Sequence, residues 1–177
     1  MSVLHPLRAP ALWLALSLSA GCAASFPIPP ATPTLDHLPL ARFDRVDEGV
    51  YRSSQPSGAD LRLLQQRYGL RAIVKLNRGS DDAPAGMTVR HFPLDPEQTP
   101  SPQKVRAILD AIDQAEKPVL IHCTYGEDRT GLVVALHRIR HGASVPEAYT
   151  DMMRRGFHPY TGLWNAWLRE VGWDRPK

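Results

Sequence analysis

Cysteine is scarce in this sequence, which holds only Cys22 and Cys123 among its 177 residues. Two cysteines exclude a disulfide framework and a cysteine-rich zinc site. No other set of metal ligands and no glycine-rich nucleotide loop is evident, so we expect neither a metal nor another cofactor. The formal net charge is only +3 and no basic stripe accompanies it, which argues against nucleic-acid binding.

Long hydrophobic runs are lacking too, since the apolar segment Ala9–Ala20 is too short to span a bilayer comfortably. Residues 1–22 resemble a bacterial lipoprotein signal, in which cleavage makes the cysteine, here Cys22, a lipidated N-terminus. Ser19 departs from that pattern, which usually has leucine there. Ordinary signal cleavage and an uncleaved anchor are the alternatives. All three predict export to the periplasmic side of a bacterial membrane, and lipidation of Cys22 would anchor the chain to it.

The length of the chain indicates a single folded domain, and proline marks where that domain begins. Residues 23–42 contain five of the 17 prolines and few candidates for a core. This composition favours an extended tether between the membrane and the domain. The folded domain is therefore expected to span residues 43–177, with Cys123 as its single thiol.

The most informative stretch runs from Pro118 to Leu136. Its apolar start, Pro118–Ile121, predicts a buried strand, and Thr130–Leu136 predicts the beginning of a helix. Between them lie Cys123, five further residues and Arg129. A loop that leads into a helix N-terminus directs several backbone N–H groups at one point, which binds anions and favours a thiolate. The guanidinium of Arg129 adds a planar fork for two phosphate oxygens.

The order His122-Cys123, five residues, then Arg129-Thr130-Gly131 resembles the active-site loop of the cysteine-dependent protein tyrosine phosphatases, and among them the dual-specificity branch. Tyr51–Pro56 also resembles the first strand of bacterial and fungal members. The resemblance implies that Cys123 attacks phosphorus and that water hydrolyses the thiophosphate. It further implies that the Thr130 hydroxyl stabilises the departing thiolate, unless it merely caps the helix, and that His122 orients the loop. Phosphate would be held by the loop from Thr124 through Tyr125, Gly126, Glu127 and Asp128 to Arg129.

The rest of the chain alternates between strand and helix patterns, which is typical of an α/β fold. We expect a small, largely parallel central sheet with helices on both faces, as in protein tyrosine phosphatases. The expected strands are 49–56, 71–76, 87–94 and 118–121, and the expected helices are 59–68, 102–112, 130–141, 144–155 and 161–171.

A general acid is needed when the leaving oxygen is a poor leaving group, and the sequence leaves its identity open. Relatives take an aspartate from a loop about thirty residues before the cysteine, and Asp95 occupies such a place. Glu97 lies in the same loop. Asp128 is the rival, because Gly-x-Asp-Arg-Thr loops of myotubularin-type lipid phosphatases use their aspartate in acid–base work. Each carboxylate could instead be structural, as a solvated loop charge or as an ion-pair partner.

Charge in the loop also bears on the substrate. Two carboxylates, Glu127 and Asp128, beside a phosphate dianion cost on the order of 1 kcal/mol each when partly solvated. This favours a singly phosphorylated substrate, either a phosphorylated protein or a small phosphomonoester, over a crowded polyanion. Two interpretations of Arg52 and His158 stay open, a reach into the phosphate pocket or a place on the solvated surface, and we prefer solvated surface for both. The pair Trp164 and Trp167 is interpreted as core.

Three functions remain to be compared. The first is a phosphomonoesterase that forms a cysteinyl-phosphate. The second is a phosphate-binding module of the same fold without turnover. The third, sulfur transfer by a rhodanese-like cysteine loop, is disfavoured because Arg129-Thr130 suits phosphate.

Overall fold

The computed structural model describes residues 40–173. The predicted signal segment, its lipidation site Cys22 and most of the predicted tether lie outside this range. The last residues of that tether nevertheless belong to the folded domain, because Leu40 is buried and the Arg42 side chain pairs with Glu127. No helix between residues 40 and 173 is long and apolar enough to cross a membrane.

The described chain forms one five-stranded sheet in the order β1-β2-β5-β3-β4. Every neighbouring pair is parallel except β1 and β2 at one edge, so the prediction of a largely parallel sheet is confirmed. Strand β1 was not among the predicted strands, because its residues Asp-Arg-Val-Asp are mostly charged and lack hydrophobic alternation. Charged residues are common on edge strands because they discourage pairing with another chain. The strands are β1 (Asp44–Asp47), β2 (Val50–Ser53), β3 (Ala72–Lys75), β4 (Thr88–His91) and β5 (Val119–His122).

Five helices accompany the sheet in the described residues, and three of them begin with the serine caps expected from the sequence. Ser57 and Ser144 each form a capping box, and Ser101 precedes a proline in the first turn. Two helices begin earlier than predicted, one at Gly58 instead of Ala59 and the other at Asp128 instead of Thr130. The helices are α1 (Gly58–Tyr68), α2 (Pro102–Asp113), α3 (Asp128–Arg140), α4 (Val145–Arg154) and α5 (Gly162–Val171).

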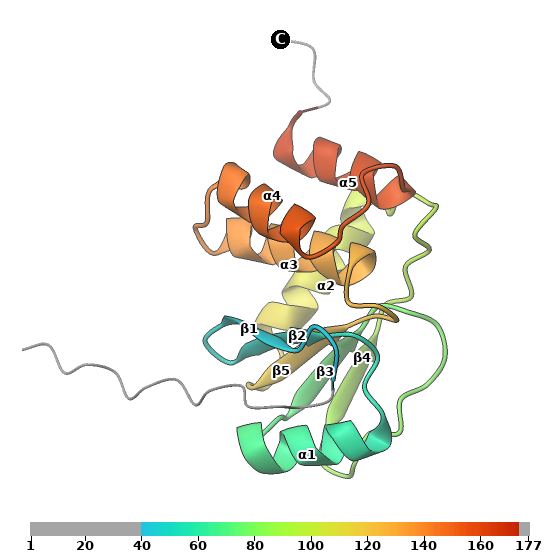
Figure 1. The fold of residues 1–177 in the computed structure, drawn as a ribbon, viewed down its shortest axis with the longest axis vertical. Coiled ribbons are helices and arrows are strands. Elements are labelled where there is room, and N and C mark those ends of the chain that lie inside the picture. The colour runs from blue at the N-terminus through green and yellow to red at the C-terminus, as the bar shows by residue number, and fades with distance from the viewer. Residues whose placement is uncertain (1–39, 174–177) are drawn as a thin grey trace, which may run out of the picture. The chain divides into compact units, whose positions relative to one another are not determined.

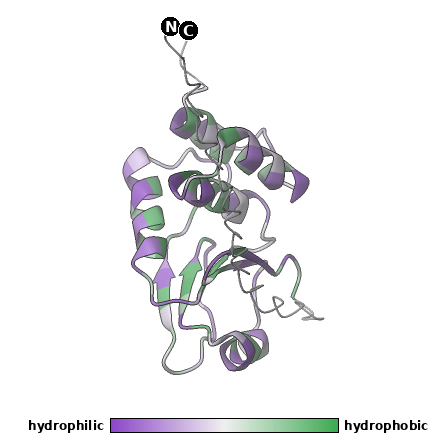
Figure 2. Ribbon diagram, turned by 90° about the vertical axis from the view of Figure 1, so that its left-hand side faces the viewer, coloured by the Kyte–Doolittle hydropathy of each residue, from purple (hydrophilic) through white to green (hydrophobic). Residues whose placement is uncertain are grey.

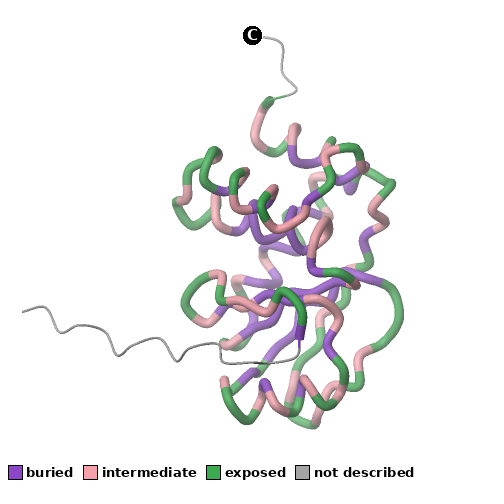
Figure 3. The backbone as a smooth tube through the Cα atoms, in the orientation of Figure 1, coloured by how far each residue is buried: buried purple, intermediate pink, exposed green. Residues whose placement is uncertain are grey.

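Both faces of the sheet are covered, as predicted: α1 lies on one side and the other four helices lie on the opposite side (Figure 1). Alternate strand residues therefore enter two cores. Ile73 and Leu120 pack with residues of α1, whereas Val74 and Ile121 join the larger core under α2–α5. The central strands are buried while the connecting loops are exposed (Figure 3). Along the helices, hydrophobic and hydrophilic residues alternate in the manner of amphipathic surfaces (Figure 2).

The core includes Trp167, which is fully buried, while Trp164 is half-buried against it. Packing on both faces fixes β5 in the middle of the sheet, between β2 and β3. Ligands of open α/β sheets bind at the carboxyl ends of such strands. Cys123 follows the last residue of β5, so the fold places the thiol at that edge.

Candidate active site

The thiol of Cys123 lies in a short loop between β5 and α3. Its side chain is only 1% exposed. The backbone N–H of Gly126 donates a hydrogen bond to the Cys123 sulfur, with 3.2 Å between nitrogen and Sγ. Together with the N-terminus of α3, this amide favours negative charge on the sulfur. The strand–loop–helix arrangement inferred from the sequence is therefore present.

Gly126 is required by the shape of this loop. Its φ angle is +73°, and an added Cβ would lie 2.8 Å from both the carbonyl oxygen of Ser53 and the backbone nitrogen of Ser54. A side chain would therefore push the loop away from β2. The same residue bonds to Cys123, so its backbone position bears directly on the thiol.

Replacing Gly126 by alanine is expected to lower kcat about 10²-fold or more, because the amide would leave the sulfur. The matched control is Gly69→Ala, since Gly69 has a similar φ of +65° but open space around it. Both variants should lose about 1–2 kcal/mol of unfolding free energy to backbone strain, and Gly126→Ala should lose more because its Cβ clashes with Ser53 and Ser54. Only Gly126→Ala should lose activity, as measured by phosphatase assays alongside urea denaturation. Equal activity in the two variants would contradict a catalytic role for the loop geometry.

Arg129 projects from the first turn of α3 and donates a hydrogen bond to the Thr124 hydroxyl at 3.1 Å. Both residues line a pocket of about 350 Å³ at the sheet edge. This size suits a small organic phosphate. We call it the catalytic pocket below because it adjoins the Cys123 loop through Thr124 and Arg129, although the buried Cys123 does not itself line it. It is lined by Asn77, Arg78, Leu94, Asp95, Pro96, Thr124 and Arg129.

The Thr130 side chain is fully buried, and its hydroxyl has no hydrogen-bond partner among residues 40–173. The helix-cap interpretation of Thr130 is wrong, because α3 begins at Asp128 and its cap residue is Glu127. Buried hydroxyls normally have a partner.

The two rival aspartates occupy different surroundings. Asp95 lines the catalytic pocket with Arg129, and its carboxylate lies 3.9 Å from the guanidinium of Arg78. Asp128 instead accepts hydrogen bonds from the backbone N–H of His158, at 2.7 Å, and from the His158 ring, at 3.0 Å. It therefore ties the start of α3 to the segment after α4.

The loop that carries Asp95 is held against α5. Gly162, the first residue of α5, lies so close to the Glu97 carbonyl that no side chain would fit there. The Thr99 hydroxyl donates to the Gly162 carbonyl at 3.0 Å, and Arg169 donates to the Pro100 carbonyl at 2.9 Å. These contacts join the end of the chain to the pocket wall. Glu97 is exposed and does not line the catalytic pocket.

A buried polar network lies beside the loop, and sequence analysis missed it. The His122 ring contacts the carboxylate of Asp81 at 2.9 Å, and Lys75 donates to the same carboxylate at 2.6 Å. Gln55 donates to it as well, at 2.8 Å. Burial alone would raise the pKa of Asp81, but the hydrogen bonds from His122, Lys75 and Gln55 outweigh it and hold that pKa well below its usual range. Asp81 thus orients the histidine that precedes the nucleophile.

Replacing Asp81 by asparagine is expected to cost about 3 kcal/mol of unfolding free energy, because Lys75 would keep a buried charge without its counterion. The neighbouring Asp82→Asn is the matched control, since the Asp82 side chain is 85% exposed. The native carboxylate has a depressed pKa, so its stabilisation should be present above about pH 4 and be lost as the pH falls further. Urea denaturation at neutral and acidic pH measures both effects. Equal losses in the two variants would contradict the role of the network.

Four other residues considered in the sequence can now be placed in the structure. Arg52 is not on the surface: it is 1% exposed and donates to the Gly126 carbonyl at 2.6 Å. His158 is exposed, as expected, although it binds Asp128. Glu127 pairs with Arg42 and therefore does not present an isolated charge to the loop. Tyr125 is 65% exposed.

Within residues 40–173, the structure gathers two groups of potential metal ligands that the sequence did not reveal. One contains Glu127, Asp128 and His158, and the other contains Asp113, His137 and His141. In the first group, Glu127 already pairs with Arg42, and Asp128 already pairs with His158. The chemistry discussed below uses neither group.

Comparison with known proteins agrees with this geometry. Residues 46–143 match a family model described as "Polymorphic toxin system, DSP-PTPase phosphatase". The chain belongs to the dual-specificity phosphatases. This membership makes it a cysteine-dependent phosphatase of the protein tyrosine phosphatase superfamily, as the loop resemblance implied.

Individual dual-specificity phosphatases show the same relationship. TpbA from Pseudomonas aeruginosa strain UCBPP-PA14 is 30% identical over 167 residues, which cover 85% of this chain and 76% of TpbA. A crystal structure of P. aeruginosa TpbA shares 27% identity with a TM-score of 0.64, over 73% of this chain and 84% of that chain. TpbA has also been crystallised with phosphotyrosine. The PP-IP phosphatase SIW14 from S. cerevisiae shares only the fold, at 19% identity and a TM-score of 0.63, over 77% of this chain and 96% of that chain.

Proposed function

We propose that this phosphatase hydrolyses phosphotyrosine through a cysteinyl-phosphate, with Cys123 as the nucleophile. The thiolate attacks phosphorus, an S–P bond forms, and the bond from phosphorus to the tyrosine oxygen breaks. The Gly126 amide next to the sulfur, at 3.2 Å, and the fork of Arg129 support the phosphoryl oxygens in this step. Asp95 gives its proton to the leaving phenolate oxygen.

In the second step water attacks the phosphorus and returns a proton to Asp95. The S–P bond breaks, which releases inorganic phosphate and restores the thiolate. The unpartnered hydroxyl of Thr130 stabilises the departing sulfur. No electron transfer takes place, and the two steps consume only the ester and one water.

The single observation that carries this assignment is the catalytic pocket, in which Asp95 faces the same space as Arg129 and Thr124. Asp128 fits a positioning role better, since His158 already donates to its carboxylate twice. An acid must reach the leaving oxygen, so Asp95 is preferred over Asp128 and over Glu97.

The substrate class follows from the walls of the same pocket. Pro96 offers apolar surface in the pocket lining for an aromatic ring, and Tyr125, which is exposed in the catalytic loop but does not line the pocket, offers another. The pocket is lined by two cationic residues, Arg78 and Arg129. Because Arg78 lies near the carboxylate of Asp95, only Arg129 remains to bind phosphate, which suits a substrate with a single phosphate group. This favours phosphotyrosine over an inositol polyphosphate, and the complex of TpbA with phosphotyrosine lends support.

The test compares kcat/KM for a phosphotyrosine peptide, the matching phosphoserine peptide and an inositol polyphosphate. We expect the phosphotyrosine peptide to be the best substrate, with phosphate release abolished in Cys123→Ser. Faster turnover of the inositol polyphosphate would overturn the substrate class while leaving the phosphatase assignment intact. Binding of phosphate without any turnover would instead favour the non-catalytic module.

The enzyme acts on the exported side of the membrane in this proposal, because residues 1–22 resemble a lipoprotein signal. Cys22 would then carry the lipid anchor. Labelling with a radioactive fatty acid in a bacterial host tests this directly, with Cys22→Ala as the control. Equal labelling of both proteins, or an unprocessed chain in the cytosol, would contradict the anchoring.

A further inference from the structure

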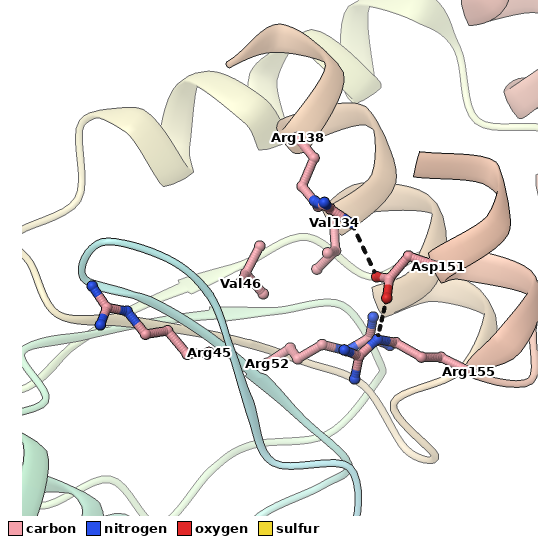
Figure 4. Close-up of a pocket in the computed structure, with 7 residues that line it drawn as sticks. All are labelled: Arg45, Val46, Arg52, Val134, Arg138, Asp151 and Arg155. Carbon is pink, nitrogen blue, oxygen red and sulfur yellow. Dashed lines mark hydrogen bonds and ion pairs between the residues drawn. The ribbon is translucent and has the colours of Figure 1, made fainter. Parts of the chain in front are cut away.

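A second pocket, of about 180 Å³, lies between β1 and β2 on one side and α3 and α4 on the other (Figure 4). It shares no lining residue with the catalytic pocket. Four of its seven lining residues are arginines and one is an aspartate, so its interior is strongly cationic. We call it the arginine pocket; it is lined by Arg45, Val46, Arg52, Val134, Arg138, Asp151 and Arg155.

Arg52 is the unusual member of this set. Its side chain is 1% exposed, yet its Nε and Nη1 atoms have no hydrogen-bond partner among residues 40–173. Only Nη2 is engaged, by the Gly126 carbonyl. Burial, and after it the nearby Arg155, lower the pKa of Arg52 to about 10. A buried guanidinium edge without acceptors is costly, so an acceptor is missing here.

The other charges around the pocket do not supply that acceptor. The guanidinium of Arg155 lies 3.0 Å from the carboxylate of Asp151 and 2.6 Å from that of Asp44. The guanidinium of Arg138 lies 3.4 Å from the Asp151 carboxylate. Both nearby carboxylates are therefore occupied by these two arginines, as Figure 4 shows for Asp151. The Nε of Arg45 donates to a backbone carbonyl of its own hairpin. The surplus positive charge inside the pocket is therefore that of Arg52, whereas the exposed Arg45 lies at the rim with its guanidinium directed away from the other arginines (Figure 4).

We propose that the arginine pocket is a second anion site, which binds one inorganic phosphate through the free Nε and Nη1 edge of Arg52. A guanidinium edge of this kind holds two oxygens of a phosphate at once. The pocket is smaller than the roughly 300 Å³ at which small-molecule sites begin, so a single oxyanion fits better than a nucleotide or a phosphopeptide. The site goes beyond the proposed function, since phosphate bound here is not the group transferred.

The site is connected to the catalytic loop through one residue. Arg52 holds the carbonyl of Gly126 at 2.6 Å, and the amide of Gly126 holds the Cys123 sulfur at 3.2 Å. An anion that immobilises Arg52 therefore also steadies the peptide that contacts the thiol. Inorganic phosphate, the product of the reaction, would then bind in the arginine pocket and stabilise the Cys123 loop through Arg52.

The number of phosphate ions bound per full-length chain tests the proposal, by equilibrium dialysis with radioactive inorganic phosphate. We expect two sites in the wild type and one in Arg138→Gln, which loses a pocket cation. Arg129→Met, which weakens the catalytic site, should keep the arginine pocket. The matched control Arg140→Gln lies on the same helix and is exposed outside the pocket, so it should retain both sites.

A second variant guards against misfolding of Arg138→Gln. Arg45 is exposed, so Arg45→Glu should fold, which circular dichroism checks, while weakening phosphate binding in the pocket at least about tenfold. One phosphate site in the wild type would overturn the proposal. Two sites of unchanged affinity in both Arg45→Glu and Arg138→Gln would overturn it as well. Loss of substrate turnover alone would leave it standing, because the count of sites does not depend on catalysis.

Discussion

Replacing Cys123 by serine is expected to reduce kcat/KM on phosphotyrosine peptides on the order of 10⁴-fold or more, as for other essential nucleophiles. A serine hydroxyl is not ionised at neutral pH by one amide and a helix N-terminus, so the attacking atom would be lost. The Gly126 amide and Arg129 would remain, and phosphate should still bind. Steady-state kinetics together with phosphate binding separate these two effects.

The sequence provides a matched control for this experiment, because it contains one other cysteine. Cys22→Ser removes a thiol outside the phosphatase domain and should leave kcat/KM unchanged. Activity of Cys123→Ser within tenfold of the wild type would contradict the cysteinyl-phosphate mechanism. Loss of phosphate binding in Cys123→Ser would instead indicate that the loop had collapsed, which circular dichroism and a second substitution, Cys123→Ala, would detect.

Replacing Asp95 by asparagine is expected to slow poor leaving groups about 10²–10⁴-fold, which is the usual contribution of a general acid. Phenyl phosphate has such a leaving group, because its phenolate needs a proton as the ester bond breaks. The nitrophenolate of p-nitrophenyl phosphate leaves without one, so that substrate should be much less affected. The ratio of kcat for the two substrates in each variant measures the effect.

Asp128→Asn is the comparison that decides between the two aspartates. Because His158 donates to this carboxylate from its backbone and its ring, the change should loosen the start of α3 and slow both substrates alike. A selective loss with phenyl phosphate in Asp128→Asn, together with equal effects in Asp95→Asn, would reverse the assignment. The alternative raised by the Gly-x-Asp-Arg-Thr resemblance would then be correct.

The buried Arg52 and Asp81 show where reading the sequence alone is least effective. Arginine is rarely fully buried, so Arg52 was interpreted as surface. Its partner, the Gly126 carbonyl, lies 74 positions away in the chain. Asp81 stands in a polar loop that looked solvated, and its partner His122 is 41 positions away. No local period encodes such long-range pairs, and the short charged strand β1 escaped notice because it has no hydrophobic alternation.

The α/β class, the strand before Cys123, the helix after it and the spacing of the thiol from Arg129 could all be predicted from the amino-acid sequence. These features depend on local periodicity and on residues within one loop, where the chain has few other conformations. Three features became visible in the folded molecule alone: the carboxylate that shares a pocket with Arg129, the contact of Asp81 with His122, and the burial of Arg52 behind the loop. Each of these depends on segments brought together by core packing, and packing is a property of the whole fold.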